Sequence, residues 1–193
     1  GPSNCYRSIA WTSMNQIFAQ AQVGLIDYGV LGATQIDRYG NINSTMLGED
    51  FARPKKRFPG SGGANEVASY CWKTIVIMLH ERRRFVPRVD FVTSPGYLDG
   101  TPGARERAGL PSDTGPWRVV TSKALFGFDG ESREMKLIGV LQGLTQAEVL
   151  AEMEFKPVVA EPLELLAPPT AGELRILREE IDPSRTIVGR PAQ

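Results

Sequence analysis

A glycine-rich segment from Gly60 to Asn65 is the strongest chemical signal in the sequence, and it reads Gly-Ser-Gly-Gly-Ala-Asn. Consecutive glycines that lead into a helix can aim several backbone N–H groups at one anionic oxygen, so the segment could hold a phosphate or stabilise an oxyanion. It is not a P-loop, because no Gly-Lys-Ser/Thr follows, and Asn65 stands where the dinucleotide fingerprint has a third glycine or an alanine. The alternative is a tight turn whose glycines only supply positive φ angles.

Polar amide side chains follow an apolar run at residues 25–33. If that run is a strand, Gln35 and Asn43 stand beyond its carboxyl end, where open α/β sheets place their ligands. These two amides could therefore orient a substrate. Asp37 and Asn41 lie in the same stretch, and the simpler interpretation of these two is that they cap and shape a turn.

Two further segments carry reactive side-chain types. The run from His80 to Arg84 offers a general base beside an acid and three cations, but a solvated cluster with its own salt bridges is the favoured interpretation. The long loop 93–100 contains Ser94 and Asp99. A hydrolase triad is disfavoured there, because the sequence has no Gly-x-Ser-x-Gly motif and His80 is the only histidine.

The elements that would position these residues follow from the spacing of apolar positions. Residues 9–23 show the pattern of an amphipathic helix, and a second helix over 64–72 should begin at the glycines. The β-branched run 74–79 suits a parallel strand buried on both faces, and 25–33 also suggests a buried strand. Right-handed βαβ crossovers and an α/β fold, with a mostly parallel sheet flanked by helices, are therefore expected.

The second half of the chain should be more antiparallel. Strands are expected at 89–93, 117–121, 125–128 and 135–140, with Asp129-Gly130 as the hairpin turn between the last two. Two later helices should begin at capping boxes, which pair Thr145 with Glu148 and Thr170 with Glu173. The second of these helices should end at Asp182-Pro183.

Composition narrows the function classes. The 193 residues suit one domain spanning 1–193, and 22 basic against 22 acidic residues give no electrostatic footprint for nucleic acid. No apolar run is long enough to cross a membrane and no signal region is visible, so a cytoplasmic location is expected. Cys5 and Cys71 are too far apart to suggest a disulfide or zinc framework, and no metal site is expected.

Together these segments resemble a known family. The chain resembles the β (B) subunits of class I CoA-transferases, in particular that of glutaconate CoA-transferase, over nearly its whole length. The segments that carry the resemblance are Gly32–Asp37, Tyr39–Thr45, Gly60–Asn65, His80–Phe85, Thr93–Gly96 and Arg178–Pro183. Their combination is far more specific than any one of them.

The resemblance implies a fold of the CoA-transferase type, related to the NagB/RpiA-like proteins, and an obligate α (A) partner subunit in a heterodimer or heterotetramer. It also implies ping-pong transfer of CoA between an acyl-CoA and a carboxylic acid, with coenzyme A as substrate and no permanently bound cofactor. The backbone N–H groups of Gly62, Gly63 and Ala64 would form the oxyanion hole. Gln35, Asn41, Asn43 and Ser94 would contact substrate or CoA.

One departure from the family pattern concerns the nucleophile. The family uses a glutamate in a Glu-Ser-Gly or Glu-Asn-Gly segment that would align before Gly1, and neither Glu49 nor Glu66 has that context. We therefore expect an upstream piece to complete the fold. A ring-hydrolysing enzyme for acyl-CoA steroid catabolites, or a non-catalytic acyl-CoA-binding partner, are the alternative functions. The segments Ser94–Gly96 and Gly62–Ala64 favour transfer.

Overall fold

The computed structural model describes residues 8–186. Its helices are α1 (Met14–Gln22), α2 (Ala64–Tyr70), the 3₁₀ turn η2 (Arg82–Arg84), α3 (Ala104–Arg107), α4 (Gln146–Ala151), α5 (Ala171–Arg175) and the π-helical η3 (Ile176–Ile181). Its strands are β1 (Tyr28–Leu31), β2 (Gln35–Ile36), β3 (Ile42–Asn43), β4 (Met46–Leu47), β5 (Lys56–Arg57), β6 (Lys73–Met78), β7 (Pro116–Thr121), β8 (Ala124–Phe128), β9 (Met135–Leu141) and β10 (Val158–Leu166).

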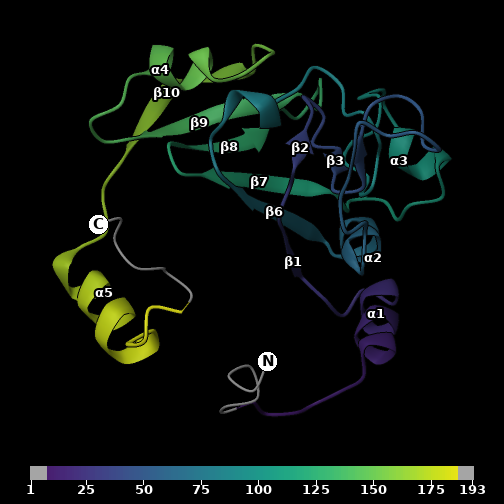
Figure 1. Ribbon diagram of the computed structural model, residues 1–193, viewed down its shortest axis with the longest axis horizontal. Helices are drawn as coiled ribbons and strands as arrows, with labels where there is room; N and C mark the ends of the chain where they lie inside the picture. Colours follow the sequence, from purple (N-terminus) through teal and green to yellow (C-terminus); the bar gives the residue numbers. More distant parts are fainter. Residues whose placement is uncertain (1–7, 187–193) are drawn as a thin grey trace.

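Six strands form the main sheet, in the order β1-β6-β7-β8-β9-β10 (Figure 1). The pairs β1–β6, β6–β7 and β9–β10 are parallel, whereas β8 is antiparallel to both of its neighbours. The expected α/β fold, mostly parallel at first and more antiparallel in the second half, is therefore confirmed. The hairpin between β8 and β9 turns at Asp129-Gly130, where Asp129 N–H donates to the Glu134 carbonyl at 2.8 Å.

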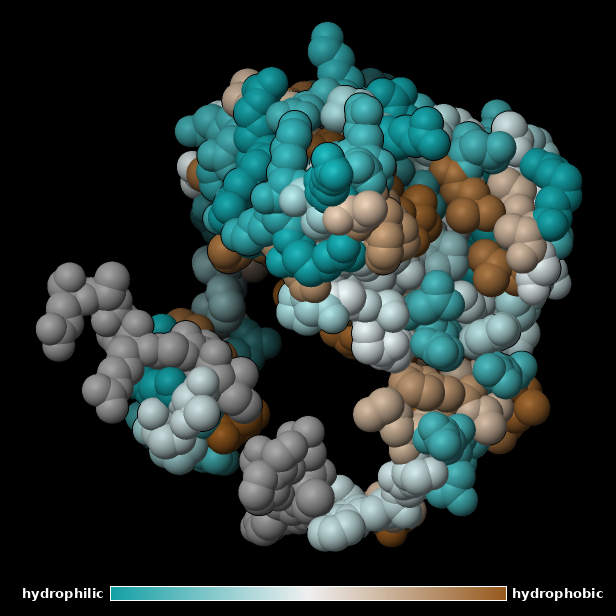
Figure 2. Space-filling model, turned by 45° about the vertical axis from the view of Figure 1, so that its right-hand side comes forward, coloured by the Kyte–Doolittle hydropathy of each residue, from teal (hydrophilic) through white to brown (hydrophobic). Residues whose placement is uncertain are grey.

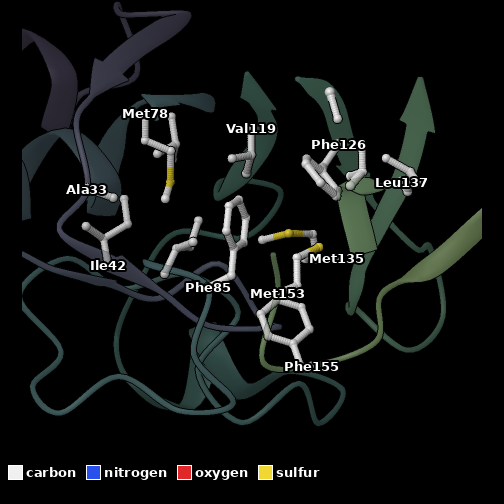
Figure 3. Packing of buried hydrophobic residues seen from close by; sticks show 14 of the residues in the cluster. Ala33, Ile42, Met78, Phe85, Val119, Phe126, Met135, Leu137, Met153 and Phe155 are labelled. Carbon is white, nitrogen blue, oxygen red and sulfur yellow. The ribbon is translucent and has the colours of Figure 1, made fainter. Parts of the chain in front are cut away.

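The core lies on one face of this sheet. Side chains of β6 to β9, among them Met78, Val119 and Phe126, gather around Phe85, which follows η2 (Figure 3). Val76, Phe85, Val119 and Phe126 are fully buried. Burial of side chains of this size contributes about 1.5–3 kcal/mol each, so this layer fixes the loops around Phe85 against the sheet.

The opposite face of the sheet is exposed at β1 and β6, which contradicts the expectation that these two strands are buried. Tyr28 and Val30 of β1 are 51% and 59% exposed, and Ile77 of β6 is 55% exposed. Side chains alternate across a strand, so the same strands send Gly29, Thr74 and Val76 into the interior. The apolar composition of the runs therefore predicted strands correctly, but predicted burial on both faces wrongly, because no element of residues 8–186 shields these side chains.

The predicted helix ends agree with the structure more closely than the predicted strand at 89–93 does. Thr145 and Thr170 form the expected capping boxes with Glu148 and Glu173, and the terminal helix ends at Asp182. The strand expected at 89–93 does not form; its neighbour Ser94 makes only an isolated bridge with Ile42. The α5–η3 helix stands apart from the body, with hydrophobic residues at its surface (Figure 2).

Candidate functional site

The glycine-rich segment forms an exposed turn at the N-terminus of α2, which begins after its cap residue Gly63. Ala64 N–H is already bonded to the Ser61 carbonyl at 2.8 Å. For the amides of Gly62 and Gly63, the described part of the chain supplies no hydrogen-bond partner. Of the three backbone donors expected here, two are thus available to an external acceptor, and the third is engaged within the turn.

The turn is held from two sides. Gly60 N–H donates to the Ser44 carbonyl at 3.1 Å, and Ser44 Oγ donates back to the Gly60 carbonyl at 3.1 Å. On the far side, Asn65 Nδ2 donates to the carbonyl of Thr93 at 3.2 Å. Because donors and acceptors are fixed at both ends, the two available amides are held in place before any ligand binds.

Thr93 connects the two anchors. Its Oγ1 accepts a hydrogen bond from Ser44 N–H at 2.9 Å and lies 2.8 Å from Thr45 Oγ1. Its carbonyl is the acceptor of the Asn65 amide. The loop before the glycine turn and the helix after it are therefore tied to one residue.

Gln35 and Asn43 lie opposite each other on the paired strands β2 and β3, and both are buried. Asn43 Nδ2 donates to Gln35 Oε1 at 2.6 Å and to the Met46 carbonyl at 2.6 Å. Gln35 Nε2 in turn donates to Asp90 Oδ1 at 3.3 Å. The structure brings the two amides together as expected, but it directs their polar atoms toward the protein.

Asn41 joins the turn at residues 37–41 to the loop that contains Gly96. Its Nδ2 donates to Asp37 Oδ2 at 2.9 Å, and its Oδ1 accepts from Gly96 N–H at 2.9 Å. A Cβ on Gly96 would collide with the backbone of Tyr39–Asn41, so only glycine allows this close approach. Burial raises the pKa of Asp37, against its hydrogen bonds from Asn41 and Tyr39.

Ser94 is fully buried, and its Oγ has no hydrogen-bond partner among the described residues. Its backbone exchanges two hydrogen bonds with Ile42, at 3.0 and 3.1 Å. The side chain therefore occupies a small interior position beside β3, with the loop's backbone making the connection. None of Gln35, Asn41, Asn43 and Ser94 exposes a polar side-chain atom freely to solvent in this structure.

His80 and the arginines after it separate in the structure. Glu81 makes the expected salt bridges, with Arg83 at 2.7 Å and Arg84 at 2.9 Å. His80 instead turns inward, where its ring lies against Phe85 and its Nε2 is 3.0 Å from the Val149 carbonyl. The interpretation as a solvated cluster holds for the arginines but is wrong for the histidine.

The buried His80 predicts a pH dependence of stability. Burial lowers its pKa below the ordinary histidine value of 6.5, so the folded protein favours the neutral ring. As the pH falls below about 6.5, the unfolded chain takes up the proton first, and the free energy of unfolding decreases until the folded pKa is passed. Urea unfolding between pH 7.5 and 5 should show this loss. A His80→Gln variant should lack the part of this loss that comes from protonation of His80. An identical pH dependence of the unfolding free energy in both proteins would show that His80 does not cause it.

Arg105 of α3 is a buried cation to which no sequence motif points. Its Nη1 donates to the Gly96 carbonyl at 2.8 Å, and its Nη2 donates to the Ala68 carbonyl at 3.2 Å and to Thr114 Oγ1 at 2.8 Å. It thus ties the end of α2 to the loop after Ser94. Its neighbours Glu106 and Arg107 are exposed, so the local sequence predicts a solvated charge and gives no signal of this role.

The described residues contain no group of three or more His, Cys, Asp or Glu side chains arranged to hold a metal ion. Cys71 is a buried free thiol, and Cys5 lies outside the described residues. No helix within residues 8–186 is long and apolar enough to cross a membrane.

Known proteins are similar to this chain over most of its length. Residues 10–152 match the family described as Coenzyme A transferase. The chain is 46% identical to the B-type subunit of glutaconate CoA-transferase from Acidaminococcus fermentans over 163 residues, 84% of this chain and 60% of the relative. The crystal structure of that organism's glutaconate coenzyme A-transferase superposes with a TM-score of 0.79 at 43% identity, covering 85% of this chain and 62% of the other.

Two further relatives are named for different activities. The B-type subunit of 3-oxoadipate CoA-transferase from Pseudomonas knackmussii is 37% identical, with 81% of this chain and 59% of the relative covered. A cholesterol ring-cleaving hydrolase subunit of Mycobacterium tuberculosis is 29% identical, with 90% of this chain and 67% of the relative covered. The chain spans about three fifths of the length of the two CoA-transferase subunits.

Proposed function

Because the chain belongs to the coenzyme A transferase family, we propose that it serves as the B-type subunit of a heteromeric CoA-transferase. With an A-type partner, in a heterodimer or heterotetramer, it moves CoA from an acyl-CoA thioester to a carboxylic acid. The observation that carries this proposal is the exposed turn with two available amides, at Gly62 and Gly63. The free thiol of Cys71 suits the reducing cytoplasm in which acyl-CoA chemistry takes place.

The reaction needs an attacking carboxylate and hydrogen-bond donors that stabilise an oxyanion. A carboxylate attacks the thioester carbonyl and displaces CoA as a thiolate, which leaves a mixed anhydride; the thiolate then attacks the enzyme-side carbonyl, giving an enzyme thioester and the free acid. Each attack passes through a tetrahedral oxyanion. In our proposal the amides of Gly62 and Gly63 donate to that oxygen, and one such donor is worth about 100–1,000-fold in rate.

We propose a positioning role for the buried amides, beside the substrate contact that the resemblance implies for them. Gln35, Asn41 and Asn43 use their polar atoms within the protein, so we assign them, with Ser94, to positioning the loops around the glycine turn. They act on the substrate through the backbone that they hold. The family resemblance assigns the attacking carboxylate to a glutamate in a Glu-Ser-Gly or Glu-Asn-Gly segment, a context that neither Glu49 nor Glu66 has.

Chemical trapping tests the proposal. The heteromer, incubated with its acyl-CoA but without acceptor, should form an enzyme thioester that hydroxylamine converts to a hydroxamate and borohydride reduces to an alcohol. Mass spectrometry of the digested subunits would locate the modified glutamate. Turnover without any trapped adduct would contradict the ping-pong mechanism.

A second candidate function is hydrolysis of a ring-bearing acyl-CoA, and the similarity to the mycobacterial ring-cleaving hydrolase subunit favours it. The two reactions differ in their mass balance. Hydrolytic ring opening adds one water to the acyl-CoA and needs no acceptor acid, whereas transfer leaves the acyl mass unchanged and requires a second carboxylate. Product mass with and without added acid therefore separates them.

A further inference from the structure

A second feature lies beyond the carboxyl ends of β1 and β6. A cavity of about 290 Å³ opens there between Thr34, which follows β1, and the η2 residues Arg83 and Arg84, which follow β6. Lys56 of β5 and Phe58 form part of its wall. Phe58 stands only two residues before Gly60, so one short backbone segment joins this cavity to the turn.

The cavity carries an excess of positive charge. Its lining contains three cations, and the acid in contact with them is Glu81, which both arginines share through the same oxygen. Lys56 has no acidic partner among the described residues, and its Nζ lies 5.5 Å from the centre of the Phe58 ring. Arg83 uses Nε and Nη2 on Glu81, so its Nη1 is left to bind another group. A net charge of about +2 therefore faces the opening.

The wall of the cavity also has an apolar part. Leu47 and the ring of Phe58 line it beside the cations. An aromatic ring next to an ammonium and two guanidinium groups suits a ligand that combines a flat ring with anionic groups, since the ring stacks while the anions receive charge-assisted hydrogen bonds. A bare metal cation or a purely apolar ligand would be disfavoured by the charge.

We propose that this cavity, defined by Lys56, Phe58, Arg83 and Arg84, binds the phosphate groups at the nucleotide end of acyl-CoA. The inference rests on the proposed function and specifies where its thioester substrate is held. In this proposal the pantetheine arm runs from the phosphates at Lys56 and Arg83 to the amides of Gly62 and Gly63, which follow Phe58 closely in the chain. The distal carboxylate of a dicarboxylic acyl group has similar anion chemistry and is the alternative source of the negative charge.

Two charge-removing variants test the site, Lys56→Gln and Arg83→Gln. Arg84 keeps its bond to Glu81 in both, and its Nη1 still donates to the Ala33 carbonyl, so the fold should persist. For the assembled heteromer, KM for acyl-CoA should rise about 5–20-fold for each lost charge, with kcat nearly unchanged, because each removes a charge-assisted bond that is formed in the bound substrate and in the transition state. Arg178→Gln, an exposed arginine on η3, is the matched control and should leave KM unchanged.

Truncated substrates identify the anion. KM for the matching acyl-pantetheine, which lacks the nucleotide, should be high in the wild type and insensitive to both substitutions. Equal losses with acyl-CoA and acyl-pantetheine would overturn the phosphate assignment. If the effect instead disappears when a dicarboxylic acyl group is replaced with a monocarboxylic one, the cavity binds the acyl carboxylate and the proposal is wrong.

Direct binding separates this inference from the proposed function. Adenosine 3′,5′-bisphosphate, titrated into the heteromer in a calorimeter, should bind the wild type and bind the Lys56→Gln/Arg83→Gln double variant about 25-fold or more weakly. No difference between the two proteins, with trapping still successful, would overturn the cavity assignment and leave the transferase intact. Binding that is lost in the double variant, with no covalent adduct from any acyl-CoA, would support the cavity and overturn the transferase.

Discussion

Replacing Gly63 with alanine should lower the kcat of the assembled transferase about 100–1,000-fold, with a much smaller change in KM. A Cβ at this position would overlap the Phe18 ring of α1, so either that ring or the glycine turn must shift, and the prediction assumes that the turn shifts. The displaced amides would then miss the oxyanion, and a donor that stabilises only the transition state affects kcat most. Steady-state kinetics of the variant heteromer measures this effect.

Two control variants distinguish displacement of the Gly62 and Gly63 amides from a general loss of structure. Phe18→Ala should restore much of the lost kcat when it is combined with Gly63→Ala, because it removes the ring that the new Cβ meets. Gly130→Ala is the matched single change, since a Cβ there meets nothing within 4 Å. Unchanged kcat in Gly63→Ala, or no rescue by Phe18→Ala, would contradict the role assigned to the turn.

Replacing Arg105 with methionine should have the largest effect on stability, a loss of about 3–5 kcal/mol of unfolding free energy. The carbonyls of Ala68, Pro95 and Gly96 would lose the guanidinium that now donates to them. Each is then a buried acceptor without its donor, and methionine has a similar length but no N–H groups. Urea unfolding with an unchanged m-value would measure the loss.

Arg107→Met is the appropriate control, because it removes the same group from the same short helix at an exposed position. It should cost less than about 1 kcal/mol. Arg105→Lys should fall between the two, because an ammonium keeps the charge but cannot reach both the Gly96 and the Ala68 carbonyls that the guanidinium joins. Equal losses at positions 105 and 107 would show that burial of Arg105 does not matter.

The features predictable from sequence were those with local causes. The capping boxes of Thr145 and Thr170 need only a hydroxyl and an acid three residues apart, and the turn at Asp129-Gly130 is held by hydrogen bonds within residues 129–134. The apolar, β-branched composition that predicts β1 and β6 is equally local. The glycine turn before α2 belongs in the same group, since its positive φ angles at Gly60 and Gly62 require glycine.

Sequence reasoning missed the contacts in which a residue's partner is distant in the chain. Asn41 and Gly96 are 55 positions apart, and so are Gln35 and Asp90, so neither hydrogen bond can be inferred from spacing. An amide that could face a ligand and one that braces two loops have the same local sequence. Likewise, the composition of Tyr28–Leu31 predicts a strand but does not reveal which of its faces is covered.

The hydrogen bonds of Ser44 and Asn65 to Thr93 couple the positions of the two sides of the glycine turn. Ser44 reaches its hydroxyl and Asn65 its carbonyl, so a shift of one attachment strains the other. If both hydrogen bonds to Thr93 are weakened, the loss of unfolding free energy should be smaller than the sum of the two single losses. The first change already loosens the turn that the second would loosen. Any change in the position of the turn would then require concerted changes in segments that lie 28 and 49 positions away from Thr93.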